Sequence, residues 1–476
     1  MNTLTNKMGK KINVWDIFFI YIIGCVILCI MLLADIDSIN TTMLTAWVGN
    51  ILLLYGIYVF KKYTGTHINQ YSLFWISWFV FSYGQIFLYS MGITDGKYDV
   101  MMRYSTELIN QYLFYFILAS IFVLIAGQRI LVSNTVEPIN TGEIQISDIT
   151  VRIVFCLMLV ISASIFWSDL LSMIMLSGTY GYHAIYENRE GANSLISSIS
   201  MWYIPSLLVL MASYKNSKCK IFILFLLLFP ALCFLYIGLR GRALAIILSV
   251  LFLWHSSIKP LNGKKTFILI GLGILFFNVI FGIAAIRDEG SRSFEFMVNS
   301  ILTQHSTGNS VINSISEMGG SMQIWLMLQS LIPQQYSYDY GFSYLASLLS
   351  CIPSFLLDGF SFSKYANLSE WIMNVEGSNY GLGFSLIGEA YYNFGWFGII
   401  ALFFVGYFIF YVLSGKWGSK KLIKYQQAFA AIGLYIFITT VRDSMYLSFR
   451  YILYTIIIPI ILIYLIESDR HRKRKK

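Results

Sequence analysis

Charged residues are scarce in this 476-residue chain, because Asp, Glu, Lys and Arg together make up only 12% of it, against about 25% in soluble domains. Hydrophobic residues make up 57%. A soluble protein with so few charges could not cover its surface with polar groups, so the composition excludes an ordinary soluble enzyme, a disordered chain and a coiled coil. The long unbroken apolar runs also exclude a transmembrane β-barrel, whose strands alternate apolar and polar residues.

Cysteine and the common motifs of zinc and nucleotide chemistry are also sparse or absent. The six cysteines include no Cys-x-x-Cys pair and no Cys/His cluster, so we expect neither a disulfide framework nor a structural zinc site. No P-loop, Gly-x-Ser-x-Gly, His-Glu-x-x-His or dinucleotide-binding motif occurs in a usable context. The sequence therefore points away from the large classes of soluble hydrolases and nucleotide-dependent enzymes.

What the chain has in abundance is apolar segments, which predict an all-α polytopic integral membrane protein. A helix needs about 20 apolar residues to cross the bilayer core. About twelve segments qualify as transmembrane helices, at residues 13–33, 42–60, 71–92, 107–127, 151–168, 196–213, 220–238, 243–257, 266–285, 394–413, 426–441 and 445–466. We divide the chain into a membrane domain (1–285), one large external loop (286–393), further membrane helices (394–466) and a basic tail (467–476).

The net charge of +9 fits this topology and does not require a nucleic-acid partner. With the N-terminus in the cytoplasm, most Lys and Arg residues fall on the cytoplasmic side, including the run at residues 470–476. Most acidic residues fall on the other side. Because the positive-inside rule predicts this asymmetry, we expect both termini in the cytoplasm and residues 286–393 outside.

The large loop is a candidate functional region, since loops of this length inside a compact membrane protein are usually functional. Its apolar stretches at 321–332 and 341–356 predict short amphipathic helices that lie on the membrane surface or dip into it. The loop and its end are also rich in tyrosine. Aromatic faces with polar groups suit a glycan, whereas an interfacial aromatic belt is the alternative. The candidate glycan-binding residues are Tyr336, Tyr338, Tyr340 and Tyr391.

Arginine dominates the basic residues of the predicted external face, whereas lysine dominates inside. The positive-inside rule counts the two residues alike, so topology does not explain the difference. Arginine stays charged in a low-dielectric site and grips phosphate with a planar fork, which indicates an anionic ligand such as a phosphate. Local ion pairs and interface anchors are the alternatives. The candidate pyrophosphate-binding residues are Arg240, Arg242, Arg287, Arg292, Arg442 and Arg450.

Two positions among these arginines are distinctive. Residues 238–242, Gly-Leu-Arg-Gly-Arg, join two apolar segments with almost no loop, so glycine is expected to permit a tight turn with both arginines at the outer boundary. Arg450 lies inside the last apolar segment, and an ionisable residue there is a functional candidate.

Glu389 and His305 are the candidate catalytic residues. Glu389 lies just before the predicted helix at 394–413. A carboxylate at such an apolar boundary could act as a general base or brace the start of the helix. His305 is a base candidate at neutral pH, or a solvated loop histidine. Asp35 and Asp37 have the spacing of a metal-binding pair, although two solvated loop acids are the simpler interpretation.

Residues 381–400 carry a resemblance to a known family. Their sequence, Gly-Leu-Gly-Phe-Ser-Leu-Ile-Gly-Glu-Ala-Tyr-Tyr-Asn-Phe-Gly-Trp-Phe-Gly-Ile-Ile, resembles the end of the large periplasmic loop in Wzy-type O-antigen and capsular repeat-unit polymerases. The Gly-Leu-Arg-Gly-Arg turn, the roughly twelve helices and the single long outer loop are also similar to that family.

The resemblance implies a glycosyltransferase of the bacterial inner membrane that needs no metal and no cofactor. It would transfer a growing glycan from undecaprenyl pyrophosphate to a new lipid-linked repeat unit at the periplasmic face, in O-antigen or capsule biosynthesis. Arginines would neutralise the pyrophosphate, and Glu389 or His305 would deprotonate the acceptor hydroxyl. The implied partners are the lipid-linked oligosaccharide, membrane lipids, and a chain-length regulator and flippase of the same pathway, with no nucleic acid.

Other membrane activities are alternatives. One is an O-antigen ligase, and another is a metal-dependent polyprenol-sugar glycosyltransferase that uses Asp35 and Asp37. A lipid-linked oligosaccharide flippase is less favoured, because almost no charges lie in the predicted helix centres and a flippase has no use for such a long outer loop.

Overall fold

The computed structural model describes residues 14–93, 100–133, 146–187, 194–261, 263, 310–378, 381–417 and 420–475. Every regular element in these ranges is a helix, which confirms the predicted fold class. Nine helical stretches of the described residues are long and apolar enough to cross a membrane. The predicted segment 266–285 lies outside the described residues, and each of the other predicted segments falls on a helix.

The N-terminal helices begin and end at local capping signals. They are α1 (Val14–Leu33), α2 (Ile39–Thr64), α3 (Gln70–Ser90) and α4 (Thr106–Ser133), with a 3₁₀ turn, η1, at Val100–Met102. At the start of α2, Ser38 Oγ accepts a hydrogen bond from Asn40 N, and Gly65 ends the helix with φ 83°. At the start of α3, Asn69 Oδ1 accepts one from Ser72 N. These side chains satisfy amide groups that the helices leave unpaired.

The next helices are α5 (Asp148–Tyr180), α6 (Ala184–Glu187), α7 (Ser194–Ser200), α8 (Tyr203–Ser213), α9 (Ser217–Ile237) and α10 (Arg240–Leu253), followed by a π-helical turn, η2, at Trp254–Ile258. α5 is about 50 Å long at 1.5 Å per residue, well beyond the roughly 30 Å of a bilayer core. The tight turn predicted between α9 and α10 is confirmed, since Gly238 ends α9 with φ 100° and α10 begins at Arg240.

Short helices fill the described part of the predicted loop, as expected. They are α13 (Ser310–Gly319), η3 (Gly320–Met322), α14 (Gln323–Leu331), α15 (Phe342–Leu349), η4 (Ser354–Leu357), α16 (Ser363–Ala366) and α17 (Leu368–Glu376). α13 packs tightly on α3, because a Cβ on Gly319 would lie only 2.5 Å from Gln85 N. Trp325 on α14 is fully buried. This part of the loop is therefore built into the protein core.

The C-terminal elements are α18 (Leu386–Phe394), η5 (Gly395–Phe397), α19 (Gly398–Leu413), η6 (Lys420–Tyr425), α20 (Gln426–Thr440), α21 (Met445–Ile452), the π-helical turn η7 (Leu453–Ile457) and α22 (Ile458–Lys475). The helix predicted from residue 394 is preceded by another helix, α18. Ser385 caps the start of α18, because its Oγ accepts a hydrogen bond from Gly388 N (3.0 Å). Glu389 and Asn393 make α18 too polar to stand out as an apolar run. The sequence places Glu389 just before a predicted helix, whereas in the structure Glu389 lies within α18.

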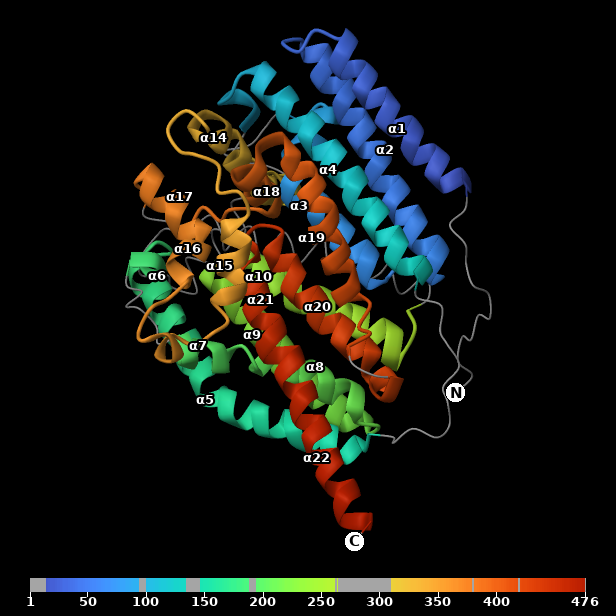
Figure 1. The fold of residues 1–476 in the computed structure, drawn as a ribbon, viewed down its shortest axis with the longest axis vertical. Helices are drawn as coiled ribbons and strands as arrows, with labels where there is room; N and C mark the ends of the chain where they lie inside the picture. Colours follow the sequence, from blue (N-terminus) through green and yellow to red (C-terminus); the bar gives the residue numbers. More distant parts are fainter. Residues whose placement is uncertain are drawn as a thin grey trace.

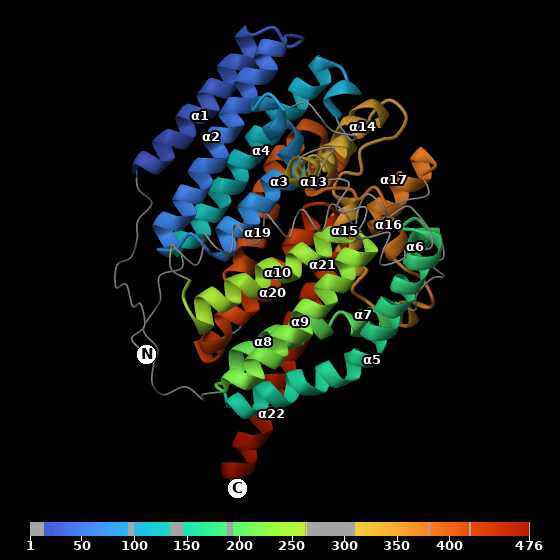
Figure 2. The ribbon, with the colours of Figure 1, turned by 180° about the vertical axis from the view of Figure 1, so that it is seen from behind.

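The helices form two groups that meet near the centre of the molecule. α1, α2, α4 and α19 lie side by side, whereas α5, α8, α9, α10 and α20 form the second group (Figure 1). α15 and α21 lie in the middle of both views, and α6, α16 and α17 gather at one side, on the left in Figure 1 and on the right in Figure 2. The C-terminal end of α22 projects from the bottom of the molecule in Figure 1.

Candidate active site

A break in a membrane helix is the centre of the candidate site. α18 and α19 are separated by the 3₁₀ turn η5. The loop before α15 closes this break, because Asp339 N donates to Tyr392 O (3.2 Å) and Tyr340 N donates to Asn393 O (3.0 Å). The loop therefore satisfies two of the last carbonyl groups of α18, which the helix itself leaves unpaired.

Glu389 joins three helices at this break. Its Oε2 accepts a hydrogen bond from Met445 N (2.8 Å) at the start of α21, and its Oε1 accepts one from Ser343 Oγ (3.2 Å) on α15. Asn393 Nδ2 donates to the same Ser343 Oγ (2.8 Å). Ser444, the N-cap residue of α21, makes no side-chain cap bond, so the Glu389 carboxylate caps that helix from α18. We call Glu389, Ser343, Asn393 and Met445 the α18 junction.

The burial of Glu389 limits the role it can play. Its side chain is 0% exposed, and both of its carboxylate oxygens accept hydrogen bonds. A general base has to come within about 3 Å of the proton that it removes. In this arrangement Glu389 is enclosed, so the geometry favours the bracing role over the catalytic role. The other candidate base, His305, lies outside the described residues.

Asp339 is an acidic residue of this region that the sequence did not single out. Its Oδ2 accepts a hydrogen bond from Ser343 N (2.6 Å) at the start of α15. The residue is partly exposed, unlike Glu389. Burial raises the pKa of the Asp339 carboxyl, and the hydrogen bond from Ser343 N opposes that rise. Asp339 therefore combines a fixed position with access to solvent.

The turn between α20 and α21 is tied directly to the segment that precedes α18. Arg442 O accepts hydrogen bonds from Phe384 N (3.1 Å) and Ser385 N (3.3 Å). A Cβ on Gly383, whose φ is 75°, would lie 2.5 Å from that carbonyl oxygen. Among the described residues, no carboxylate forms an ion pair with the Arg442 guanidinium. The backbone of Arg442 is therefore fixed, and its partly exposed side chain is available to an anion.

The two arginines of the α9–α10 turn differ from each other. Arg240 Nη1 lies 2.6 Å from Glu317 Oε2 on α13, with side chains 9% and 15% exposed respectively. Arg242 lies over the ring of Phe234, 5.7 Å from its centre, and it has no carboxylate partner in the described parts of the chain. Arg240 thus fastens the turn to the large loop, whereas Arg242, like Arg442, has no carboxylate partner among the described residues.

Arg450 is a buried residue with protein partners. It donates to Tyr446 Oη (3.0 Å) and to Ser198 Oγ (2.8 Å), which lies on α7, and it is 6% exposed. These contacts hold α21 against α7. Arg287 and Arg292, the remaining two arginines predicted to bind pyrophosphate, lie outside the described residues.

The four candidate glycan-binding tyrosines fall into two environments. Tyr340 is 76% exposed and Tyr336 is 39% exposed, with Tyr338 partly exposed beside Tyr340. Tyr391 is 3% exposed and packs against Trp325 with ring centres 5.0 Å apart. The first three present aromatic surface beside the helix break, whereas Tyr391 belongs to the core beneath them.

Metal chemistry finds no support in the described ranges. No group of three His, Cys, Asp or Glu side chains there is placed to hold a metal ion. Asp35, one of the two acids with metal-like spacing, instead accepts a hydrogen bond from Asp37 N (3.2 Å), as in an ordinary polar turn. These residues therefore give no preference to a metal-dependent transferase.

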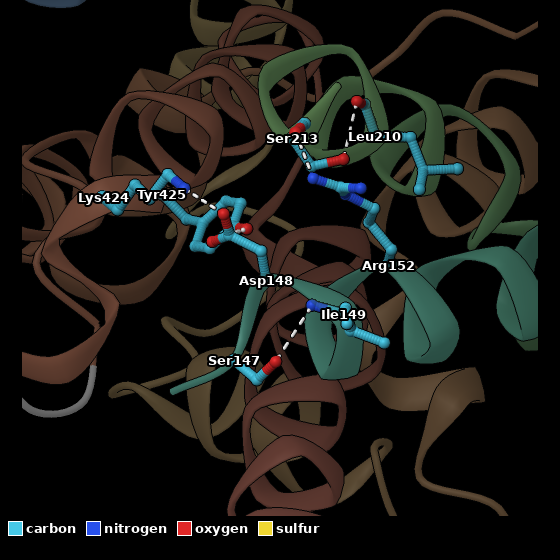
Figure 3. Close-up of polar contacts among 8 residues, drawn as sticks. All are labelled: Ser147, Asp148, Ile149, Arg152, Leu210, Ser213, Lys424 and Tyr425. Carbon is cyan, nitrogen blue, oxygen red and sulfur yellow. Dashed lines mark hydrogen bonds and ion pairs between the residues drawn. The ribbon is translucent and has the colours of Figure 1, made fainter. Parts of the chain in front are cut away.

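A second polar junction lies at the start of α5 (Figure 3). Asp148 forms an ion pair with Lys424 and accepts a hydrogen bond from Tyr425 Oη (2.8 Å), which holds α5 to η6. Arg152 Nη2 donates to Ser213 O (3.1 Å) on α8. We call Asp148, Lys424, Tyr425, Arg152 and Ser213 the α5 junction.

The same end of α5 is fastened to the C-terminal helix. Ser147 N (3.3 Å) and the Thr150 hydroxyl both donate to Glu467 Oε1 on α22. Arg470 Nη1 lies 3.6 Å from the same oxygen. These contacts hold the start of α5 to α22.

Comparison with known proteins gives one result that covers the chain. The family model described as O-antigen polysaccharide polymerase Wzy matches residues 16–474, nearly the whole sequence. No curated protein and no solved structure shows a significant match.

Proposed function

This chain belongs to the Wzy family of O-antigen polysaccharide polymerases, and from that premise we propose which reaction it performs and where. It transfers a growing glycan from undecaprenyl pyrophosphate to the sugar end of a new lipid-linked repeat unit. The reaction takes place at the periplasmic face of the bacterial inner membrane, with both chain termini in the cytoplasm.

One observation carries this proposal. Beside the break between α18 and α19, exposed tyrosine rings and the Arg442 turn are attached to the same short stretch of chain. Tyrosine faces suit sugar rings, and a guanidinium suits a phosphate. A substrate that is a glycan joined to a pyrophosphate presents both groups together.

The described arginines divide by their partners. We assign Arg442 and Arg242 to the pyrophosphate, because neither pairs with a carboxylate in the described residues. Arg240 and Arg450 have protein partners and position the helices around the site. Arg287 and Arg292 remain candidates for the same pyrophosphate, as the sequence suggests.

The protein's part in the chemistry is mainly electrostatic. As the pyrophosphate leaves the anomeric carbon it takes the bonding electrons, and fixed positive charge stabilises that change. The lipid tails lie among the membrane helices, and Tyr336, Tyr338 and Tyr340 hold the glycan outside. A chain-length regulator and a flippase of the same pathway are the expected partners, as in the family resemblance.

Deletion of the gene tests the proposal, followed by gel analysis of the surface glycan and of the lipid-linked pool. Surface glycan with a single repeat supports the polymerase. Polymer that accumulates on the lipid carrier without reaching the surface would identify a ligase and overturn the proposal. Polymerisation of purified lipid-linked repeat units by the isolated protein, with and without EDTA, separates it from a metal-dependent transferase.

A further inference from the structure

The position of Asp339 is fixed from two directions. Its N–H donates to Tyr392 O (3.2 Å) at the end of α18, and its Oδ2 accepts from Ser343 N (2.6 Å) at the start of α15. These bonds hold the residue before any ligand arrives, which is what a group that acts on a bound substrate requires. The same bonds would also be made by a residue that only caps α15, so the cap is the competing explanation.

The other carboxylate oxygen of Asp339 distinguishes it from Glu389. Across the ranges that the structure describes, no protein group hydrogen-bonds to Oδ1 of Asp339, whereas both oxygens of Glu389 are occupied. Asp339 is partly exposed and Glu389 is not. An incoming hydroxyl group can therefore reach Asp339 Oδ1 without displacing a protein donor.

The surroundings of Asp339 fit a sugar and a leaving phosphate. It lies in sequence between Tyr338 and Tyr340, which present aromatic surface. Ser343 links the two carboxylates, because its N donates to Asp339 Oδ2 and its Oγ donates to Glu389 Oε1. The Glu389 carboxylate also caps α21, which follows the Arg442 turn. The α18 junction thus has the partly exposed Asp339 beside its α15 side and the Arg442 turn beside its α21 side, where no carboxylate of the described residues pairs with Arg442.

We propose that Asp339 is the proton acceptor of the polymerisation reaction, an assignment that rests on the function proposed above. The acceptor-sugar hydroxyl gives its proton to Oδ1 of Asp339. Its oxygen forms the new bond to the anomeric carbon of the donor glycan, while the bond from that carbon to the pyrophosphate oxygen breaks. The pyrophosphate leaves with the electron pair of that bond, and Arg442 neutralises its charge. Glu389 is then a positioning residue that aligns the two sides.

Substitution of Asp339 by Asn separates the base from the cap. The side-chain oxygen of Asn can accept the same hydrogen bond from Ser343 N and the shape is nearly the same, but the amide cannot accept the proton. We expect Asp339→Asn to fold and bind the lipid-linked repeat unit normally. Its polymerisation rate should fall by about 10²–10⁴, the usual contribution of a positioned base. Asp35→Asn is the matched control, because Asp35 also accepts a backbone hydrogen bond in a predicted external loop, and it should keep the wild-type rate.

Two further substitutions keep the test decisive if Asp339→Asn folds poorly. Asp339→Ser retains a capping oxygen without a base, and Asp339→Glu retains a base with poorer capping geometry. The proposal expects Asp339→Glu to be less stable than Asp339→Ser but more active. Activity that instead follows thermal stability across Asn, Ser and Glu would show that Asp339 is only a cap.

The experiment uses the purified full-length protein with purified lipid-linked repeat units, and it measures chain length on gels alongside binding and thermal unfolding. A wild-type rate for Asp339→Asn, with His305→Ala inactive, overturns the assignment and moves the base to His305 while the polymerase function stands. Failure of the wild-type protein to form any polymer overturns the proposed function, and the Asp339 assignment with it.

Discussion

The α18 junction and the α5 junction both bring distant helices together through a carboxylate, but they neutralise its charge in different ways. Asp148 pairs with Lys424, so the negative charge of the α5 junction is neutralised by a cation of the same junction. Glu389 receives its hydrogen bonds from a backbone amide and a hydroxyl group, and no cation of the described residues pairs with it. Arg442, beside the α18 junction, keeps its guanidinium unpaired among the described residues.

This difference shows how a membrane protein can separate bracing from ligand binding. An ion pair inside the protein holds helices together but uses up the cation that a substrate would need. A carboxylate that caps a helix is stabilised by the helix dipole and by neutral donors. The nearby arginine then remains free for a phosphate. The α5 junction is expected to contribute stability, and the α18 junction both stability and activity.

The largest expected difference comes from the same substitution near each junction. Arg442→Lys keeps the positive charge but loses the planar fork that binds phosphate. We expect its polymerisation rate to fall by about 10²–10³, as when one donor to a developing negative charge is lost. Arg152→Lys changes a side chain that donates to Ser213 O, and its rate should match wild type. Equal rates for the two variants in the purified assay would contradict the separation of roles.

Glu389 provides the next test, because its two obvious substitutions should behave differently. Glu389→Ala removes the acceptor for Met445 N and Ser343 Oγ, and each buried group left without a partner costs about 1–3 kcal/mol. Glu389→Gln retains an acceptor for Met445 N and nearly the same shape. We therefore expect thermal unfolding to shift strongly for Ala and little for Gln, with polymerisation retained by Gln. An inactive Gln variant of wild-type stability would restore Glu389 as the base.

The sequence was sufficient for the fold where burial follows apolar runs. Segments such as 107–127 and 426–441 fall on α4 and α20, because a lipid-facing or buried helix must be apolar over its length. The apolar pattern does not predict α18 as a separate helix, because Glu389 and Asn393 are polar residues that are buried at the α18 junction. A capping signal was nevertheless present at Ser385, three residues ahead of Gly388, whose amide it binds.

The contacts of the candidate site could not be predicted from the sequence, because the residues that meet there are far apart along the chain. Glu389 was selected by its place at an apolar boundary, but its partner Met445 is 56 residues away. No local pattern predicts that contact. The Arg240–Glu317 pair is separated by 77 residues and is equally hidden. Asp339 lies two residues before Gly341, the N-cap residue of α15, so even its hydrogen bond to Ser343 N does not follow the usual capping pattern of a sequence.

A third comparison uses two glycines with similar backbone angles. Gly383 (φ 75°) leaves no room for a Cβ, which would lie 2.5 Å from Arg442 O, whereas Gly65 (φ 83°) has nothing within 4 Å. Alanine at either position incurs roughly 1–2 kcal/mol for the left-handed backbone. Gly383→Ala must also displace the Arg442 turn, so we expect it to lose polymerisation as well as stability.

Gly65→Ala should lose only stability, because α2 ends there and a Cβ on Gly65 would meet no other atom within 4 Å. Thermal unfolding and the polymerisation rate, measured on the same two preparations, decide the matter. Full activity of Gly383→Ala would show that the position of the Arg442 turn is unimportant for the reaction.

The smallest expected effect is at the ion pair of the α5 junction. Lys424 and Asp148 have side chains that are 54% and 31% exposed, so water and salt screen their attraction. Lys424→Gln should lower the free energy of unfolding by about 0.2–1 kcal/mol, and Tyr425 Oη remains as a donor to Asp148. The difference from wild type should shrink at 1 M salt, where the Debye length is about 3 Å. A double-mutant cycle with Asp148→Asn isolates the pair from the effect of each single change.

Because the charges of the α5 junction pair with each other, the polymerisation rate of Lys424→Gln should equal that of wild type at every salt concentration. A rate that falls in Lys424→Gln while unfolding is unchanged would show that this junction, too, takes part in the reaction.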